Sequence, residues 1–180
     1  MVKSIRVAIL EDHQSIIDGY IFRLSDSPEI SIVATAHWGD DLKPMLDNND
    51  VDVLVLDLNI PTSAEDHNLF PILHTLPSLR AAHPDLLILV ISMITSLPLI
   101  EALEEVGVSG YISKDDSASI QQLGKIISLI ADGGVYFNHP ARHNAEKDRS
   151  GIQLTPRQIE VLSLCAAFPD DSSQMLAKKT

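Results

Sequence analysis

The first 130 residues alternate between short apolar runs and segments in which apolar residues recur at helical spacing. Five runs have the length and the β-branched or aliphatic composition of buried strands, at 5–10, 30–36, 51–56, 86–91 and 108–113. Amphipathic helices are expected between them, and the clearest apolar stripe runs from Ile120 to Ile130. Strands alternating with helices predict a five-stranded, parallel, doubly wound α/β sheet with helices on both faces.

Prolines make the stretch between the third and fourth predicted strands the least regular part of this unit. Pro71 and Pro77 each lack the N–H group that a helix needs, so we expect a long loop and a short or broken third helix there. Ser117 or Ser119 is the expected N-cap of the last helix, and the glycine pair at 133–134 is its expected end.

A shorter second unit follows the first. Residues 134–152 have the composition of a linker, which predicts a first domain over 1–133. Thr155 followed by Pro156 has the pattern of an N-cap with proline at the first helical position, and it opens a new helical segment. We therefore expect residues 153–180 to form an incomplete all-α segment.

Charge is unevenly distributed along the chain, whose net charge is −12. Residues 1–139 hold 7 basic and 20 acidic side chains, whereas residues 140–180 hold 6 and 5. An acidic first domain is poorly suited to nucleic acid, because phosphate contacts need cationic side chains. No apolar run approaches the length of a membrane span, and Cys165 is the single cysteine, so we expect a soluble, cytoplasmic protein without membrane contact.

Polar side chains stand at the ends of four predicted strands. Glu11 and Asp12 follow the first strand, Asp57 the third, Ser92 the fourth and Lys114 the fifth. The carboxyl ends of parallel strands share one edge of the sheet, where ligands of such folds bind. Clustered carboxylates repel one another unless a cation lies among them, and hard oxygen donors suit Mg²⁺.

The ordered set of strand-end motifs resembles the receiver domain of two-component response regulators, whose fold is flavodoxin-like. The motifs are Glu11-Asp12, the run Asp57-Leu58-Asn59-Ile60-Pro61, Ser92, and the run Tyr111-Ile112-Ser113-Lys114. The resemblance covers roughly residues 4–133. It implies a regulatory phosphoacceptor and not a conventional enzyme.

The resemblance also implies a role for each acidic residue. Asp57 would accept a phosphoryl group from a sensor histidine kinase or a small phosphodonor. Glu11, Asp12, Asp57 and the backbone carbonyl of Asn59 would hold the Mg²⁺ cofactor, Glu11 directly or through water.

Three further residues have roles implied by the family. Lys114 would pair with the phosphoryl oxygens. Ser92 would move to hydrogen-bond the acyl phosphate, and Tyr111 would then turn inward as the switch aromatic. Met93 departs from the small residue usual after Ser92, and its bulk is expected to restrict access of water to the phosphoryl group.

The C-terminal segment carries a second resemblance. Residues 154–162 and 174–177 are similar to the first two helices of the LuxR/NarL-type helix-turn-helix domain. This implies a transcriptional regulator that binds DNA in its full-length form. The sequence ends before a recognition helix, so we expect a truncated domain with little specific DNA binding. A homodimer through residues 96–130 is a further expectation of the resemblance.

Two other classes of function remain open at this point. A receiver-like module could signal through protein contacts without phosphorylation. Phosphatases and phosphomutases also use an aspartyl nucleophile after a strand, but they usually carry a second acid two residues later, where this chain has Asn59. The seven histidines lack metal-ligand spacing, and we interpret them as surface or capping residues.

Overall fold

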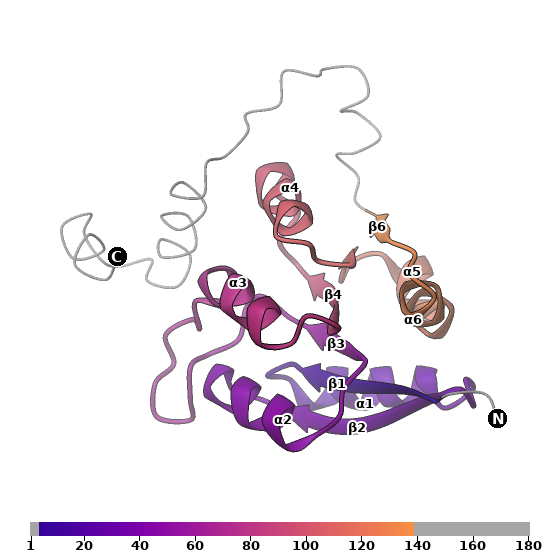
Figure 1. Cartoon of the computed structure of the whole chain (residues 1–180), viewed down its shortest axis with the longest axis horizontal. Coiled ribbons are helices and arrows are strands. Elements are labelled where there is room, and N and C mark those ends of the chain that lie inside the picture. Colours follow the sequence, from indigo (N-terminus) through magenta and orange to yellow (C-terminus); the bar gives the residue numbers. More distant parts are fainter. Residues whose placement is uncertain (1–3, 139–180) are drawn as a thin grey trace.

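A computed structural model describes residues 4–138. Within them one parallel sheet contains six strands in the order β2-β1-β3-β4-β5-β6 (Figure 1). The strands are β1 (Ile5–Leu10), β2 (Ile30–Ala36), β3 (Val53–Leu56), β4 (Leu87–Ser92), β5 (Gly110–Ser113) and β6 (Tyr136–Asn138). The parallel α/β fold and its five predicted strands are confirmed. The sixth strand was not predicted and lies in the stretch expected to be a linker.

The helices cover both faces of the sheet (Figure 1). They are α1 (Gln14–Leu24), the 3-10 turn η1 (Gly39–Asp41), α2 (Leu42–Asn48), α3 (Ile72–Ala82), α4 (Leu97–Glu105), α5 (Ser117–Gln121) and α6 (Leu123–Ala131). Buried side chains of α2, α3 and α4 form one core with the sheet, and those of α1 and α6 form the other.

The central strand β3 shows why the sheet is buried on both faces. Its four residues are at most 1% exposed. Leu54 and Leu56 point to the core of α2, α3 and α4, whereas Val53 and Val55 point to the core of α1 and α6. Burial of each such side chain contributes about 1.5–3 kcal/mol to the free energy of folding. Because both faces of β3 are buried, its sequence is continuously apolar, whereas a strand with one exposed face would alternate apolar and polar residues.

The expectation of a short or broken third helix is wrong. Helix α3 is a continuous 11-residue helix with Pro77 inside it. Pro71 occupies the N-cap position, where its missing N–H costs no helical hydrogen bond. Four buried residues of α3, including Leu76 and Leu79, anchor the helix on the sheet, so tertiary packing outweighs the loss at Pro77.

The last helix differs from prediction at its start. The N-cap is Asp116, not Ser117 or Ser119. Its side chain accepts hydrogen bonds from the backbone N–H groups of Ala118 and Ser119. The predicted stripe is also divided at Gln122 into α5 and α6. The chain leaves α6 through Gly133, whose φ of +87° suits glycine, in agreement with the predicted end.

The long loop between β3 and α3 folds back on itself. Pro61 and Leu69 form an antiparallel bridge, and the N–H of Gly39 in η1 donates to the carbonyl of Pro61 at 2.9 Å. The ring of Phe70 packs directly on Gly39, so closely that an added Cβ would lie 2.0 Å from its Cγ. Gly39 is therefore required by the close approach of this ring.

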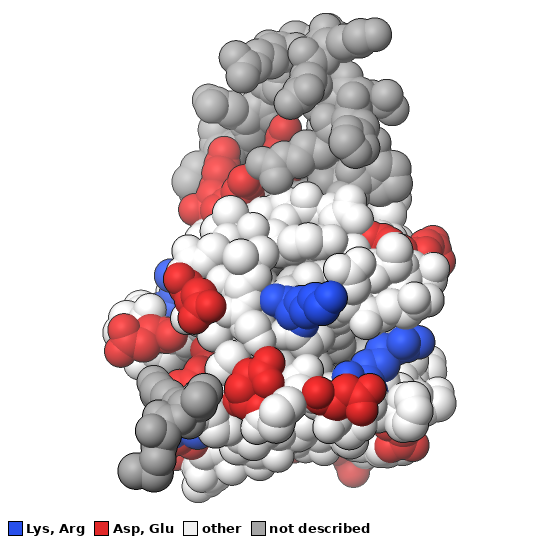
Figure 2. Space-filling model, turned by 90° about the vertical axis from the view of Figure 1, so that its right-hand side faces the viewer, with Lys and Arg blue, Asp and Glu red and all other residues white. Residues whose placement is uncertain are grey.

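The acidic character expected of the first domain is visible on one face of the molecule. On the side shown in Figure 2, lysine and arginine side chains are few and separated by acidic or uncharged residues, so this face presents no continuous basic patch. Among residues 4–138, no helix is long and apolar enough to cross a membrane. The segment expected over 153–180 and most of the predicted linker lie outside the described residues.

The contact between Gly39 and Phe70 yields the first prediction. Gly39→Ala should lower the free energy of unfolding by about 1–3 kcal/mol, because the new methyl group overlaps the ring. Urea denaturation would measure the loss, and it should shrink in a Phe70→Ala background. Gly19→Ala on α1 is the matched control, since a Cβ there meets nothing within 4 Å. Equal effects at both glycines would contradict the packing argument.

Candidate functional site

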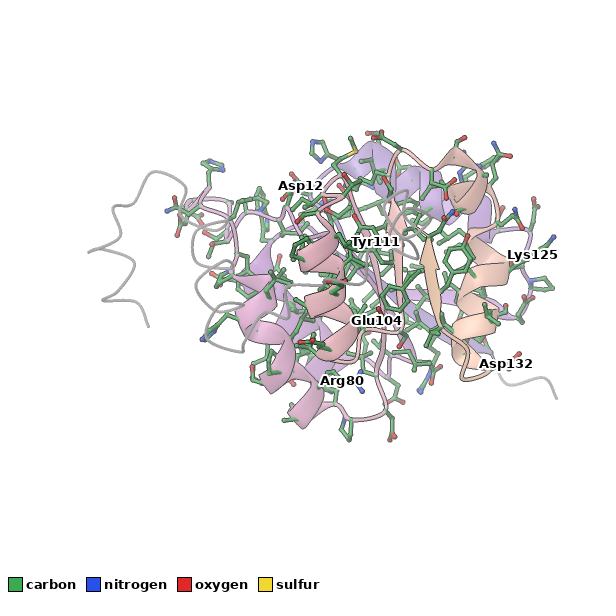
Figure 3. The ribbon with its side chains drawn as sticks, turned by 90° about the horizontal axis from the view of Figure 1, so that it is seen from above. Asp12, Arg80, Glu104, Tyr111, Lys125 and Asp132 are labelled. Carbon is green, nitrogen blue, oxygen red and sulfur yellow. The ribbon has the colours of Figure 1, made fainter. Side chains whose placement is uncertain are left out.

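The carboxyl edge of the sheet brings together the residues predicted from the strand ends. Backbone hydrogen bonds set their register, since the N–H of Asp57 donates to the carbonyl of Leu10 and that of Lys114 to the carbonyl of Ser92, both at 3.0 Å. Figure 3 shows Asp12 at this edge, opposite the edge that carries Arg80. The site therefore forms because four parallel strands end at the same level.

Lys114 is the centre of the site. Its Nζ donates to Oδ2 of Asp57 and to Oε2 of Glu11, each at 2.7 Å. Both acids are almost fully buried, with Glu11 1% and Asp57 5% exposed. One ammonium group thus links residues that follow β1, β3 and β5.

Burial and charge act against each other at this cluster. Burial disfavours the Lys114 ammonium, but the hydrogen bonds and negative charges of Asp57 and Glu11 outweigh burial, so the pKa of Lys114 is raised. Burial is also the largest influence on Glu11 and, with the negative charge of Asp57, raises its pKa against the opposing effect of Lys114. The cluster has two carboxylates for one cation, and this deficit of positive charge explains why Glu11 is not fully compensated.

The Asp57 carboxylate is held on both of its oxygens. Oδ1 accepts hydrogen bonds from the backbone N–H groups of Leu58 at 2.6 Å and Asn59 at 3.3 Å, while Oδ2 contacts Lys114. These contacts fix its orientation at the mouth of the strand ends. An oriented carboxylate beside a cation can act as a nucleophile toward an electrophile whose transferred group is anionic.

A second acidic group lies beside this pair. Among the described residues, the donor atoms close enough to share an ion belong to Glu11, Asp12 and His13, all within 4.8 Å of one another. The His13 Nδ1 lies 2.8 Å from Asp12 Oδ1 and 3.2 Å from Glu11 Oε1. The structure thus brings two predicted ligands together, and Lys114 links one of them, Glu11, to Asp57.

The donor set can be tested against the cofactor that it would hold. Glu11, Asp12 and Asp57 supply carboxylate oxygens, and Asn59 adds a backbone carbonyl at the same strand end. Oxygen donors of this kind suit a hard divalent cation such as Mg²⁺. Its charge would offset the deficit left by one ammonium beside two buried carboxylates. The residues present therefore fit magnesium.

His13 was not predicted as a neighbour of the carboxylates. Its position at the N-cap of α1 and its 65% exposed side chain agree with the interpretation of the histidines as surface or capping residues. The proximity to Asp12 and Glu11 follows from the turn between β1 and α1, and the adjacency of the three residues in sequence is the signal that indicates it.

Ser92 and Tyr111 lie inside the molecule, both 0% exposed. The Ser92 Oγ accepts a long hydrogen bond of 3.4 Å from the N–H of Ile94. The Tyr111 hydroxyl donates to the carbonyl of Ile94 and lies 3.4 Å from the carbonyl of Ser92. Burial and the negative charge of Asp57 raise the pKa of Tyr111 to about 12, so the hydroxyl remains a donor. Met93, beside Ser92, is 52% exposed at the rim of the site.

The shared ammonium group yields the second prediction. Lys114→Met preserves side-chain length but leaves two buried carboxylates without their cation, so it should cost about 3–5 kcal/mol of unfolding free energy in metal-free buffer. Chemical denaturation would measure the cost. Adding Asp57→Asn should recover part of it, because one uncompensated charge is removed. Lys125→Met on the exposed surface of α6 is the control, and a similar loss there would contradict the role given to Lys114.

Comparison with known proteins places the chain in a family. The model of the response regulator receiver domain matches residues 7–126. The transcriptional regulatory protein DegU of Brevibacillus brevis is 26% identical over 144 residues, which cover 80% of this chain and 57% of that protein. The nitrate/nitrite response regulator NarL of Escherichia coli K12 is 25% identical over 169 residues, covering 89% of this chain and 74% of NarL.

Solved structures agree on the fold. The isolated receiver domain of RcsB from Salmonella enterica serovar Typhimurium, with a beryllofluoride phosphomimetic, superposes with a TM-score of 0.65 at 20% identity, covering 75% of this chain and 94% of that one. A LuxR-family response regulator from Aurantimonas has a TM-score of 0.66 at 22% identity, covering 80% of this chain and 97% of that chain. The chain spans little more than half the length of DegU. With its relatives among the regulators of the LuxR/NarL type, the chain belongs to the response regulator receiver family.

Proposed function

We propose that Asp57 accepts a phosphoryl group from a phosphohistidine of a sensor histidine kinase. The observation that carries the proposal is the Lys114 ammonium, which lies 2.7 Å from a buried, backbone-anchored carboxylate. In the transfer, an oxygen of Asp57 forms a bond to phosphorus as the bond from phosphorus to the imidazole nitrogen breaks. The electron pair of the broken bond stays on the imidazole nitrogen, and a proton taken up by the ring gives neutral histidine on the kinase. An acyl phosphate remains on Asp57.

The residues of this chain divide the work of the transfer. Lys114 neutralises charge on the phosphoryl oxygens, since its Nζ already lies at the nucleophile. Glu11 and Asp12 would hold Mg²⁺ with Asp57 and the carbonyl of Asn59, and the ion when bound supplies further neutralisation of phosphoryl charge. Ser92, at the end of the neighbouring strand β4, would move to hydrogen-bond the new phosphoryl group.

The output proposed for the whole protein is phosphorylation-dependent regulation of transcription. It is supported by the relation to DegU and NarL and by the resemblance of 154–162 to a LuxR-type helix-turn-helix. In the full-length protein, DNA would be bound by the complete helix-turn-helix domain to which that segment would belong, and not by the acidic receiver domain. Homodimerisation through residues 96–130 and a cytoplasmic location remain predictions.

The two alternative functions are less well supported. A conventional phosphatase of the aspartyl type lacks its second acid here, because Asn59 occupies that position. A phosphorylation-independent module gives no reason for an ammonium group enclosed by two buried carboxylates at the strand ends.

Phosphate transfer to Asp57 is the third prediction. The full chain incubated with acetyl phosphate and Mg²⁺ should gain the mass of one phosphate, while the Asp57→Asn chain should gain none, because an amide is not a nucleophile here. Intact-mass spectrometry makes the measurement, with the Asp66→Asn chain as a control in the exposed β3–α3 loop. A wild-type chain without added phosphate would overturn the proposal in favour of the phosphorylation-independent module.

Binding of Mg²⁺ is the fourth prediction. An ion that binds the folded state should stabilise it by about 1.4 kcal/mol at ten times its Kd, measured as a shift of the urea transition. Asp12→Asn should abolish most of that shift. Asp132→Asn, an exposed acid at the opposite edge of the molecule (Figure 3), should leave it unchanged. Equal shifts in the two variants would show that the ion binds elsewhere.

A further inference from the structure

The strand β6 extends the sheet beyond the five predicted strands. It pairs in parallel with β5, with Gly110 opposite Tyr136, Tyr111 opposite Phe137 and Ile112 opposite Asn138. An added Cβ on Gly110 would lie 2.8 Å from the carbonyl oxygen of Tyr136, which shows how closely the two strands approach. β6 is the last element of the part of the chain that the structure describes.

One side of β6 is tied to the start of α5. The Tyr136 hydroxyl lies 2.7 Å from Oγ of Ser119, and the Asn138 amide donates to the same Oγ at 3.1 Å and to the carboxylate of Asp116. Asp116 is also the N-cap of α5. These contacts hold β6 in place without involving the Asp57 site.

Phe137 connects β6 to the core of α2, α3 and α4, on the face of the sheet opposite Tyr136. It is opposite Tyr111 in the register, and residues paired across parallel strands project to the same face. Phe137 packs against the core that contains Tyr111, as does Ile94 of the loop between β4 and α4. The side chains that border the strand therefore include the switch aromatic implied by the family.

Tyr111 has contacts in two directions. Its hydroxyl donates to the carbonyl of Ile94, two residues beyond Ser92, and its backbone pairs β5 with Phe137 of β6. A phosphoryl group on Asp57 would draw Ser92 and the loop toward it, because it adds negative charge and strong acceptor oxygens. When the loop between β4 and α4 is fixed in one conformation, the Ile94 carbonyl also fixes the Tyr111 hydroxyl. The Tyr111 ring, which lies opposite Phe137 in the register, is then fixed as well.

We propose that the Tyr111–Phe137 pair transmits the state of the Asp57 site to β6, so that phosphorylation tightens β6 on β5. This inference rests on the proposed function of Asp57. It assigns to β6 the role of the connection through which the receiver domain acts on the residues that follow position 138. The pairing with β5 and the contacts of Tyr136 and Asn138 with α5 give β6 its basal stability, and among the residues of β6 it is Phe137 that makes this stability depend on the site.

Hydrogen exchange of the full chain tests the coupling. With beryllofluoride and Mg²⁺, the backbone amide of Tyr136, which donates to the carbonyl of Ser109, should exchange at least about fivefold more slowly than without them, the lower range of typical coupling between sites. Phe137→Ala should reduce this ratio to near one, and Phe137→Leu should retain part of it. Tyr111→Phe, which removes only the hydroxyl, should also reduce the ratio.

Tyr136→Phe is the matched control, because it loosens β6 from Ser119 without changing the Tyr111 side. It should speed exchange in both states and keep the ratio. Fluorine NMR of bound beryllofluoride separates the two claims. If beryllofluoride binds but amide exchange in the wild-type chain is the same with and without it, the coupling alone is overturned. The same holds if the slowing of exchange by beryllofluoride survives Phe137→Ala. Absence of bound beryllofluoride would overturn the proposed function and the coupling together.

Discussion

The ammonium group of Lys114 lies between the carboxylates of Glu11 and Asp57, and the rest of the site depends on this arrangement. In the order of the sheet, β4 separates β3, which precedes Asp57, from β5, which precedes Lys114. Lys114 must therefore reach over the end of β4, where Ser92 lies, to contact Asp57. Two negative charges and one positive charge are enclosed there with little access to water. This deficit of positive charge favours a divalent cation, and the cation and ammonium together favour an added phosphoryl group.

Much of this site is predictable from sequence because it depends on strand ends. Apolar runs locate the strands, parallel strands end at one edge, and the residue after each run is then placed near the others. Glu11, Asp57, Ser92 and Lys114 all follow this rule. The exact contacts do not, because no pattern in the sequence specifies that Lys114 pairs with both Glu11 and Asp57.

The errors of prediction have a common physical origin in tertiary contacts. Pro77 predicts a broken helix from its missing N–H, but the packing of α3 on the sheet overrides that local preference. Ser117 and Ser119 are both good capping residues, but the Asp116 carboxylate accepts the helix N–H groups and also contacts Asn138 of β6. β6 was missed because three residues after a glycine pair carry almost no periodicity, and its strand character comes from the free edge of β5.

The central claim is that Asp57 is the residue that carries the phosphoryl group. Its most direct test is chemical localisation, in which the chain is phosphorylated with acetyl phosphate and Mg²⁺ and then reduced with borohydride. Hydride converts an aspartyl acyl phosphate to homoserine and releases phosphate, and peptide mass spectrometry locates the converted residue. We predict homoserine at position 57 and at no other acid. Conversion at Glu11 or Asp12, or phosphate on His13 with residue 57 unmodified, would contradict the account.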